Sequence, residues 1–388
     1  LYCPTGYLEL LRLQDRFVYL PEMPYRQIDL DQTARNVLTQ EKFTADGGEG
    51  SVDAFLEAMG GRRVRVSCTG PDGAPMEGFF GLLSDGTTAV VEMAAAAGLP
   101  LLEGRLDVEG ATTYGVGELL LAAAEAGARK IILGLGGSAT NDGGCGCAAA
   151  LGVRFLDEAG KALIPVGRTL ERIAHIDKTG LAPALAGVEI VTMCDIDNPL
   201  CGPNGAAAVF GPQKGADGPA VERLDRGLHH LAEVVRADLD VEILDLPGAG
   251  AAGGMGGGMA AFLGSRLQMG IDAVLDTAGF DAPLPGTRAV ITGEGRIDGQ
   301  SLRGKVVVGV ARRAKKAGIP VVAVVGDIAP GAAAAYEEGV TAMFSTNRRA
   351  IPWEQARLTA KEDLRAAAGD LFRLWAALED PCRAAGND

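Results

Sequence analysis

The segment Gly136-Gly137-Ser138-Ala139-Thr140-Asn141-Asp142 combines glycine with small polar residues in a pattern that suits anion binding. Consecutive glycines let backbone N–H groups approach an anion, and a helix that begins after them adds a favourable dipole. Ser138 and Thr140 could donate hydrogen bonds to phosphate oxygens, and Asp142 could bind a metal ion or cap the helix. A tight turn with no ligand would explain the same glycines. We predict ligand binding here, with the candidates Gly136, Gly137, Ser138, Thr140, Asn141 and Asp142.

Asp195 follows an apolar run, Val188–Met193, that reads as a buried strand. A phosphoryl acceptor needs a positioned carboxylate to take its proton, and Mg²⁺ prefers carboxylate oxygens. The alternative is an Asx-turn before Pro199. We interpret Asp195 as the candidate base for an acceptor hydroxyl and as a candidate Mg²⁺ ligand.

A third segment, Gly293-Glu294-Gly295-Arg296-Ile297-Asp298, places two carboxylates and an arginine just after another predicted strand. Arginine suits bidentate recognition of phosphate or carboxylate, and a neighbouring carboxylate could hold Mg²⁺ or be an internal ion-pair partner. We predict catalytic roles for Arg296 and Asp298, and Mg²⁺ or substrate binding by Glu294 and Asp298.

Two lysines could neutralise phosphate or a substrate carboxylate. Gly299–Val306 nearly matches a phosphate-binding P-loop, but Val306 replaces the hydroxyl residue that would hold Mg²⁺. Lys305 at a helix start is disfavoured unless it meets an anion. A solvated surface lysine is the alternative. Lys214 lies in the turn-rich segment Phe210–Gly215 and is the second candidate.

The most glycine-dense stretch is residues 247–258, in which Gly253 and Gly254 are candidates for close backbone approach to a ligand. A flexible loop is the alternative. The stretch also contains Gly248-x-Gly250-x-x-Gly253, the dinucleotide fingerprint of a nicotinamide-dependent oxidoreductase. That function would need a preceding strand and an acidic residue about 20 positions later on a second strand. Asp272 lies at that distance but follows the helix-like segment Ala260–Gln268 instead of the second strand that this function requires.

The elements that must position these residues alternate between strand and helix. We predict an antiparallel hairpin unit over about 63–95, a helix over 118–128, and buried strands at 130–135, 188–193, 288–292, 320–325 and 342–344. A second clear helix is predicted over 305–316. This alternation indicates an α/β fold with a parallel sheet, in which ligands bind beyond the carboxyl ends of the strands.

Composition limits the class of protein. A chain of 388 residues is long enough for two domains, and its net charge of −14 excludes nucleic acid as the main partner. No apolar run is long enough for a membrane span, and no secretory signal is visible. Seven cysteines without a pairing pattern predict reduced thiols in a cytoplasmic protein. With three histidines, nucleophilic catalysis by a histidine-activated residue has little material, whereas phosphoryl transfer fits the residues present.

Seven motifs, in this order, resemble the bacterial glycerate kinase family of the glycerate 2-kinase type. They are Ala45–Gly50, Val91–Ala95, Gly134–Asp142, Cys194–Leu200, Phe210–Ala216, Pro247–Gly254 and Gly293–Asp298. The resemblance implies transfer of the ATP γ-phosphoryl group to D-glycerate with Mg²⁺, giving 2-phosphoglycerate. It also implies a Rossmann-like domain with a parallel sheet built from discontinuous segments, 1–62 plus about 270–388. A smaller α/β domain would span about 63–269, with the site in the cleft between the two; a homo-oligomeric state is left open.

The N-terminal segment departs from the family pattern. Family members open with a buried strand that ends in an Asp-Ser-Phe-Lys-type loop, and residues 1–44 contain neither. We therefore keep as an alternative a catalytically impaired family member that binds nucleotide or glycerate without transferring phosphate.

Overall fold

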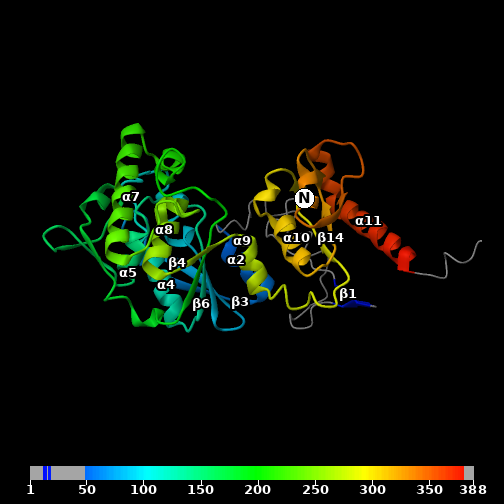
Figure 1. Cartoon of the computed structure of the whole chain (residues 1–388), viewed down its shortest axis with the longest axis horizontal. Coiled ribbons are helices and arrows are strands. Elements are labelled where there is room, and N and C mark those ends of the chain that lie inside the picture. Colours follow the sequence, from blue (N-terminus) through cyan, green and yellow to red (C-terminus); the bar gives the residue numbers. More distant parts are fainter. Residues whose placement is uncertain (1–11, 15, 19–48, 380–388) are drawn as a thin grey trace, which may run out of the picture. The chain divides into compact units, whose positions relative to one another are not determined.

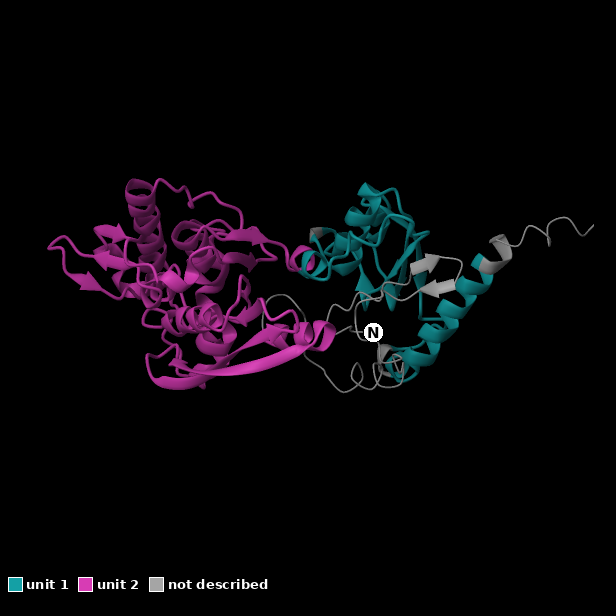
Figure 2. Ribbon diagram, turned by 90° about the horizontal axis from the view of Figure 1, so that it is seen from below, with its two compact units in different colours: residues 1–43, 274–388 teal, residues 44–273 magenta. Residues whose placement is uncertain are grey.

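The computed structural model describes residues 12–14, 16–18 and 49–379, and the chain divides into two compact units. Unit 2 comprises residues 44–273, and unit 1 comprises residues 1–43 together with 274–388 (Figure 2). The short helix α9 (Gly270–Thr277) contains the boundary between them.

Unit 2 is built around a six-stranded sheet in the order β11-β10-β6-β5-β4-β3. β4 runs antiparallel to both of its neighbours, β3 and β5, whereas β5, β6, β10 and β11 are parallel to one another. The predicted α/β class, the antiparallel unit near 63–95 and the parallel strands after it are confirmed. The strand bounds are Gly61–Thr69 (β3), Pro75–Leu83 (β4), Thr88–Glu92 (β5), Lys130–Gly134 (β6), Glu189–Met193 (β10) and Arg266–Gln268 (β11).

Alternation along β4 explains how helices cover both faces of this sheet (Figure 1). Phe80 and Leu82 point to one face and pack into a core with Leu119 and Leu120 of α4 (Tyr114–Glu125). Gly81, between them, points to the other face, where a Cβ would lie 3.0 Å from Val52 of α2 (Ser51–Met59). Successive residues of a strand face opposite sides, so a single strand supports two helix layers.

A second core in unit 2 is formed by α7 (Gly218–Leu239), the end of α8 (Ala251–Leu263) and the strands β7 (Arg154–Leu156) and β9 (His175–Asp177). Phe155 of β7 and Phe262 of α8 meet edge to face, with ring centroids 5.4 Å apart. The long helix α7 begins at Asp217, whose side chain accepts a hydrogen bond from Ala220 N. The other elements are α3 (Ala94–Ala97), α5 (Cys145–Ala150), α6 (Ala206–Phe210), β8 (Ala162–Leu163) and the 3₁₀ helices η1 (Leu99–Leu102), η2 (Gly167–Arg172), η3 (Pro183–Leu185) and η4 (Pro212–Lys214).

Unit 1 contains a three-stranded parallel sheet in the order β12-β14-β16 (Val290–Thr292, Val321–Val325 and Val340–Ser345). α10 (Val306–Lys316) connects β12 to β14 and contacts all three strands. Val322 and Val324 pack with Leu371 of α11 (Trp353–Glu379). The remaining elements are β1 (Arg12–Gln14), β2 (Arg16–Val18), β13 (Arg296–Ile297), β15 (Asp327–Ile328), η5 (Ser301–Arg303) and η6 (Ala332–Tyr336).

The structure differs from the predicted organisation in several places. Residues 51–59 and the first residues of β3 group with unit 2, because α2 packs on β4 and β5; the predicted boundary was at residue 62. Unit 2 is also the larger unit. No strand was predicted before residue 44, yet β1 and β2 pair there, and β11 replaces the end of a predicted helix. Three-residue strands are too short for an alternating pattern to identify them.

Among the described helices, none combines the length and the apolar character that a membrane crossing needs.

Candidate active site

Three loops of unit 2 meet beyond the carboxyl ends of β6 and β10, as the parallel sheet predicts. Gly143 N donates to Gly253 O at 3.0 Å, which joins the loop after β6 to the glycine-dense segment. Gly250 N donates to Asn198 O at 3.1 Å, which joins the same segment to the loop after β10. Tertiary structure thus brings together three motifs that are far apart in the sequence.

Close backbone approach explains the glycines of the middle loop. Gly253 has φ of 69°, and a Cβ there would lie 2.0 Å from Thr140 O. Ala252, Gly253 and Gly254 are all left-handed, with φ values of 54°, 69° and 90°, so regular helical geometry in α8 begins only after them. An alanine held at positive φ is strained and persists only where its surroundings enforce it.

The dinucleotide-binding alternative is not supported by this geometry. No strand precedes Gly248 in the described segment 240–250, and a Cβ on Gly250 would lie 2.2 Å from Pro199 O. Gly250 and Gly253 therefore serve contacts between loops instead of the strand–turn–helix geometry that a dinucleotide fingerprint requires.

Lys214 is buried, with 2% of its surface exposed, and it supports the loop after β6 from the inside. Its Nζ donates to Ser138 Oγ at 2.6 Å and to Thr140 O at 2.7 Å. Burial lowers the pKa of Lys214 to about 7, and the charge of Asp142 opposes that shift. The tip of the loop is exposed, unlike the part that contacts Lys214. Gly137 lies at this tip and has φ of 77°.

Asp142 is wholly buried, and its carboxylate joins α4 to α5. Its two oxygens accept from Thr113 N and Thr113 Oγ1, both at 2.8 Å, from Gly144 N at 3.1 Å and from Gly146 N at 3.2 Å. Burial raises the pKa of Asp142, and these donors oppose the rise. Of the two predicted alternatives, helix capping is the one these contacts support. The dipole that we expected to favour a ligand faces Asp142 instead.

Two residues between the ends of this loop carry buried polar atoms without a partner in the described part of the chain. They are Thr140 Oγ1 and both amide atoms of Asn141, and the two residues are 0% and 1% exposed. Buried polar atoms without a hydrogen bond cost about 1–3 kcal/mol each, so they call for a specific reason such as a functional role.

Asp195 is half-buried at the carboxyl end of β10, where the sequence placed it. Its Oδ1 accepts a hydrogen bond of 2.6 Å from Gly270 N at the start of α9. This hydrogen bond fixes the position of the carboxylate, and a general base must be positioned before it can take a proton.

Unit 1 places the third predicted segment beyond the end of β12. Glu294 accepts from Ser301 Oγ at 2.7 Å and faces Val307 N of α10 at 3.5 Å. Burial raises the pKa of Glu294, and the hydrogen bond from Ser301 opposes that rise. Glu294 therefore lies at the helix start where a P-loop would hold phosphate. Lys305 is the residue that immediately precedes α10, and it is exposed.

Arg296 and Asp298 belong to a group of ion pairs at the surface of unit 1 and not to a buried site. Arg296 Nε lies 3.8 Å from Asp298 Oδ2 and 3.5 Å from Asp327 Oδ2, and its side chain is 59% exposed. Asp298 Oδ1 also accepts from Gln300 N at 2.9 Å. The two residues are adjacent, as predicted, and Arg296 is accessible to an anion.

The described residues contain no group of three or more acidic, histidine or cysteine side chains placed to hold a metal ion. Mg²⁺ usually needs only one or two carboxylates, because substrate phosphates and water complete its shell. The loop that carries Glu294 and Asp298 fits that mode of binding, since both carboxylates lie within hydrogen-bonding range of Ser301. Asp195 is in the other unit, so its predicted role as a metal ligand stays a prediction.

Glu92 lies in the motif Val91–Ala95, but the sequence analysis predicted no role for this residue. Glu92 ends β5, is 2% exposed, and accepts from Gly50 N at 2.9 Å and Val52 N at 3.2 Å. Burial raises the pKa of Glu92 to about 7. The sequence pattern that would have identified Glu92 is an acidic residue at the end of a buried strand. The same pattern identified Asp195.

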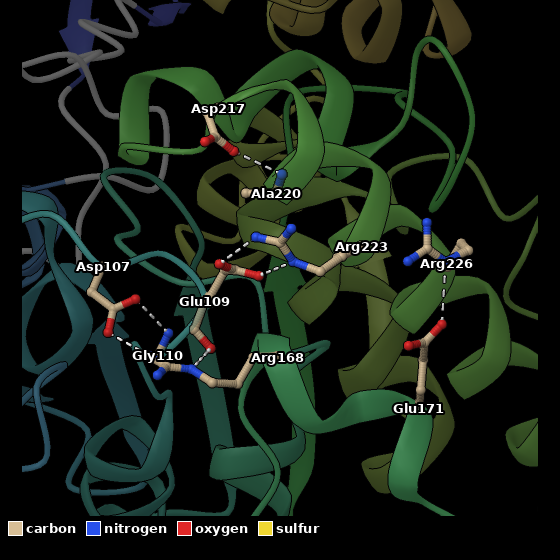
Figure 3. Close-up of polar contacts among 9 residues, drawn as sticks. All are labelled: Asp107, Glu109, Gly110, Arg168, Glu171, Asp217, Ala220, Arg223 and Arg226. Atoms are coloured by element: carbon tan, nitrogen blue, oxygen red, sulfur yellow. Dashed lines mark hydrogen bonds and ion pairs between the residues drawn. The ribbon is translucent and has the colours of Figure 1, made fainter.

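Charged side chains also fix the segment between η1 and α4 that runs beside this site (Figure 3). Glu109 accepts from Arg223 Nε at 2.9 Å and Nη2 at 3.0 Å, and Arg168 Nε donates to Glu109 O at 3.3 Å. Leu106 of the segment packs closely against Gly215, the residue after the buried Lys214. A Cβ added to Gly215 would lie 2.8 Å from the Cβ of Leu106. Exposed ion pairs add little stability, so we interpret this network as setting the path of the segment.

Comparisons with known proteins agree with these observations. A model of the glycerate kinase family matches residues 29–376, which begins ahead of the first motif that the sequence analysis identified at Ala45. The glycerate kinase of Bacillus subtilis (strain 168) is 45% identical over 330 residues, which cover 84% of this chain and 86% of that protein. The glycerate 2-kinase of Escherichia coli (strain K12) is 45% identical over 302 residues, 78% of this chain and 79% of that one.

A solved structure adds the fold to the sequence match. A crystal structure described as a glycerate kinase 2 from Salmonella typhimurium LT2 superposes with a TM-score of 0.75 at 42% identity. The superposition covers 90% of this chain and 93% of that chain. The resemblance predicted from the motifs is confirmed, and with it the classification as a small-molecule kinase. The chain belongs to the glycerate kinase family.

Proposed function

We propose that the chain transfers the γ-phosphoryl group of ATP to D-glycerate, giving 2-phosphoglycerate. The observation that carries the proposal is the meeting of three family motifs in unit 2. The loops after β6 and β10 and the glycine-dense segment are hydrogen-bonded to one another, and Lys214 lies behind them. Phosphoryl transfer depends mainly on positioning and on neutralising charge, which is what such a set of loops can supply.

In this proposal Asp195 accepts the proton of the acceptor hydroxyl. The hydroxyl oxygen forms a bond to the γ-phosphorus of ATP, while the bond between that phosphorus and the leaving ADP oxygen breaks. The hydrogen bond from Gly270 N to Asp195 holds the carboxylate in place. Arg296 is accessible and would neutralise phosphate, with Lys305 as a second exposed cation. Glu294 and Asp298 would hold Mg²⁺, which when bound neutralises phosphate charge. The predicted location of the site in the cleft between the domains stays a prediction.

The experiment is an ADP-release assay with ATP and D-glycerate, combined with ³¹P NMR of the product. We expect ADP release that depends on D-glycerate, is lower with L-glycerate, stops with a chelator and returns with Mg²⁺. A resonance of 2-phosphoglycerate is expected, and 3-phosphoglycerate would contradict the proposed regiochemistry. ATP binding by calorimetry without ADP release would favour the impaired family member instead.

A cytoplasmic location is part of the proposal. Five cysteines in the described residues are free thiols, which is typical of a reducing compartment. The redox state of the cysteines can be measured in cell extracts prepared with a thiol-blocking reagent. Reduced thiols in an active protein would support this location.

A further inference from the structure

Lys214 is buried behind the loop after β6, and this raises the question of how its charge reaches a ligand. An ammonium group has three donors and no acceptor, so in its contact with Ser138 the serine oxygen must accept. The second donor is used by Thr140 O. Because Lys214 is 2% exposed and Ser138 is 8% exposed, Ser138 is the nearer of the two to solvent.

The hydroxyl proton of Ser138 is thereby left for another acceptor. Within the described part of the chain, no hydrogen bond uses this proton, and the neighbouring Thr140 Oγ1 and Asn141 amide are also buried without partners. Backbone contacts hold the serine in place, since Ala139 N donates to Ala97 O at 2.9 Å and Leu99 N donates to Gly137 O at 2.8 Å. A fixed hydroxyl polarised by a buried cation is a strong donor for an anion.

We propose that Ser138 is the donor that this loop presents to an anionic oxygen of the ligand, and that Lys214 acts through Ser138 as a positioning residue. The proposal rests on the proposed function, because the ligand is a carboxylate of the hydroxy acid or a phosphate group of ATP. It replaces the direct contact between Lys214 and phosphate that the sequence suggested.

The arrangement makes the donor sensitive to pH. Below about 7, the pKa to which burial lowers Lys214, the ammonium can only donate and the Ser138 proton is available to the ligand. Above it, the neutral amine can also accept that proton, so it competes with the ligand for the hydroxyl donor of Ser138. The charged group acting on Lys214 is Asp142, whereas Glu103 and Arg105 on the adjacent segment are exposed and α6 carries no titratable side chain.

The test uses the full chain and the variants Ser138→Ala, Lys214→Met and the double variant. Binding of D-glycerate, ATP and inorganic phosphate is measured separately by calorimetry, together with the KM values for both substrates, from pH 6 to 9. Lys178→Met is the matched control, because Lys178 is a partly buried lysine of the same unit that donates to Ala261 O at 3.1 Å. Circular dichroism checks that each variant folds.

We expect Ser138→Ala and Lys214→Met each to weaken binding of one of the three ligands by roughly ten- to hundred-fold. The double variant is expected to lose no more than the larger single loss, because the two residues act as one donor. The ligand that is affected identifies the source of the anion, carboxylate or phosphate. Wild-type affinity should fall above pH 7, and Ser138→Ala should remove that dependence even if Lys214→Met does not fold.

Additive losses in the double variant would overturn the proposal, since Lys214 would then contact the ligand itself. Covalent labelling of Ser138 by a fluorophosphonate would also overturn it, because the neutral lysine would then be acting as a base for a nucleophilic serine. Failure of the kinase assay with intact, Ser138-dependent anion binding would reject the proposed function and leave this inference standing. Unchanged binding of all three ligands in Ser138→Ala would reject the inference alone.

Discussion

Two carboxylates of unit 2, Asp142 and Glu92, are buried among hydrogen-bond donors, and burial raises the pKa of both. Asp142 accepts hydrogen bonds from Thr113, Gly144 and Gly146, and Glu92 accepts hydrogen bonds from backbone N–H groups at the start of α2, Gly50 N and Val52 N among them. Burying a charged carboxylate is costly, so burial favours its protonated form. The buried position of Glu92 gives a prediction about stability, and the half-buried Asp195 gives one about catalysis.

The substitution Glu92→Gln is expected to change how stability depends on pH. The pKa of Glu92 rises from an ordinary value of 4.5 to about 7 on folding, so the folded chain binds this proton more tightly. Its contribution to stability is therefore full below pH 4.5 and is lost as the pH rises through 7, by roughly 3 kcal/mol. Glutamine resembles the protonated acid, so the melting temperature of the variant relative to wild type should rise between pH 5 and pH 8.

The control for this substitution is Glu77→Gln, which changes an exposed glutamate on β4. It should give a difference in melting temperature that varies little over the same pH range. A Glu92→Gln variant that is equally destabilised at pH 5 and pH 8 would show that Glu92 folds as an ionised group.

The substitution Asp195→Asn should lower kcat by about 10²–10⁴, the range expected for a general base. Asparagine keeps an oxygen that can accept from Gly270 N, so α9 should remain capped and the melting temperature should change little. ATP binding, measured by calorimetry, should be near wild type. Asp157→Asn is a control, because Asp157 accepts backbone hydrogen bonds in an exposed turn. Turnover near wild type in Asp195→Asn would remove Asp195 from the mechanism.

At the scale of elements, α8 shows how a glycine-dense segment can be rigid. Its first residues are left-handed and touch the loop after β6, and its last turn ends at Gly264, which has φ of 62°. Both ends need glycine for backbone conformation, but only the first end also needs it for space. This difference allows the two requirements to be separated by experiment.

We predict that Gly253→Ala is far more destabilising than Gly264→Ala. A Cβ at position 264 has no heavy atom within 4 Å, so its cost is the backbone term of about 1–2 kcal/mol. A Cβ at position 253 would lie 2.0 Å from Thr140 O and 2.5 Å from Asn141 Cα, so the loops must separate. Urea unfolding measures the free energies, and kcat/KM for glycerate should fall only in Gly253→Ala. Equal losses of stability would mean that the contact between the loops is not maintained.

At the scale of the whole molecule, the two units carry different natural probes. Both tryptophans, Trp353 and Trp375, lie in α11 of unit 1. The five described cysteines all lie in unit 2, and four of them are buried. Tryptophan fluorescence and thiol reactivity can therefore follow the unfolding of the two units separately, without adding a label.

We predict that saturating D-glycerate protects unit 2 more than unit 1 in the absence of nucleotide. A ligand at 100 times its Kd stabilises the part that binds it by about 2.7 kcal/mol. Cys3 and Cys382 lie outside the described residues and are replaced by serine. The urea midpoint for thiol exposure should then rise with glycerate, while the tryptophan transition moves less. A larger shift of the tryptophan transition would place glycerate binding in unit 1.

The sequence by itself determined the α/β class, the family and most of the site's candidate residues. Long apolar strands such as Lys130–Gly134 and Glu189–Met193 are readable because burial on both faces leaves a continuous apolar run. The residues after such strands are equally readable, since parallel strands end at one edge of the sheet. That rule found Asp195 and the loop after β6, and applied consistently it would have found Glu92.

Only the tertiary structure decided how those candidates are used. Hydrogen bonds between residues 76 positions apart, such as that from Lys214 to Ser138, depend on the packing of η4 behind the loop and leave no local pattern in the sequence. The same holds for Asp142, which the sequence could assign to a metal or to a helix cap until its partners from α4 were known. Residue type fixes what a side chain can do chemically, but burial and partners select which of those roles it has.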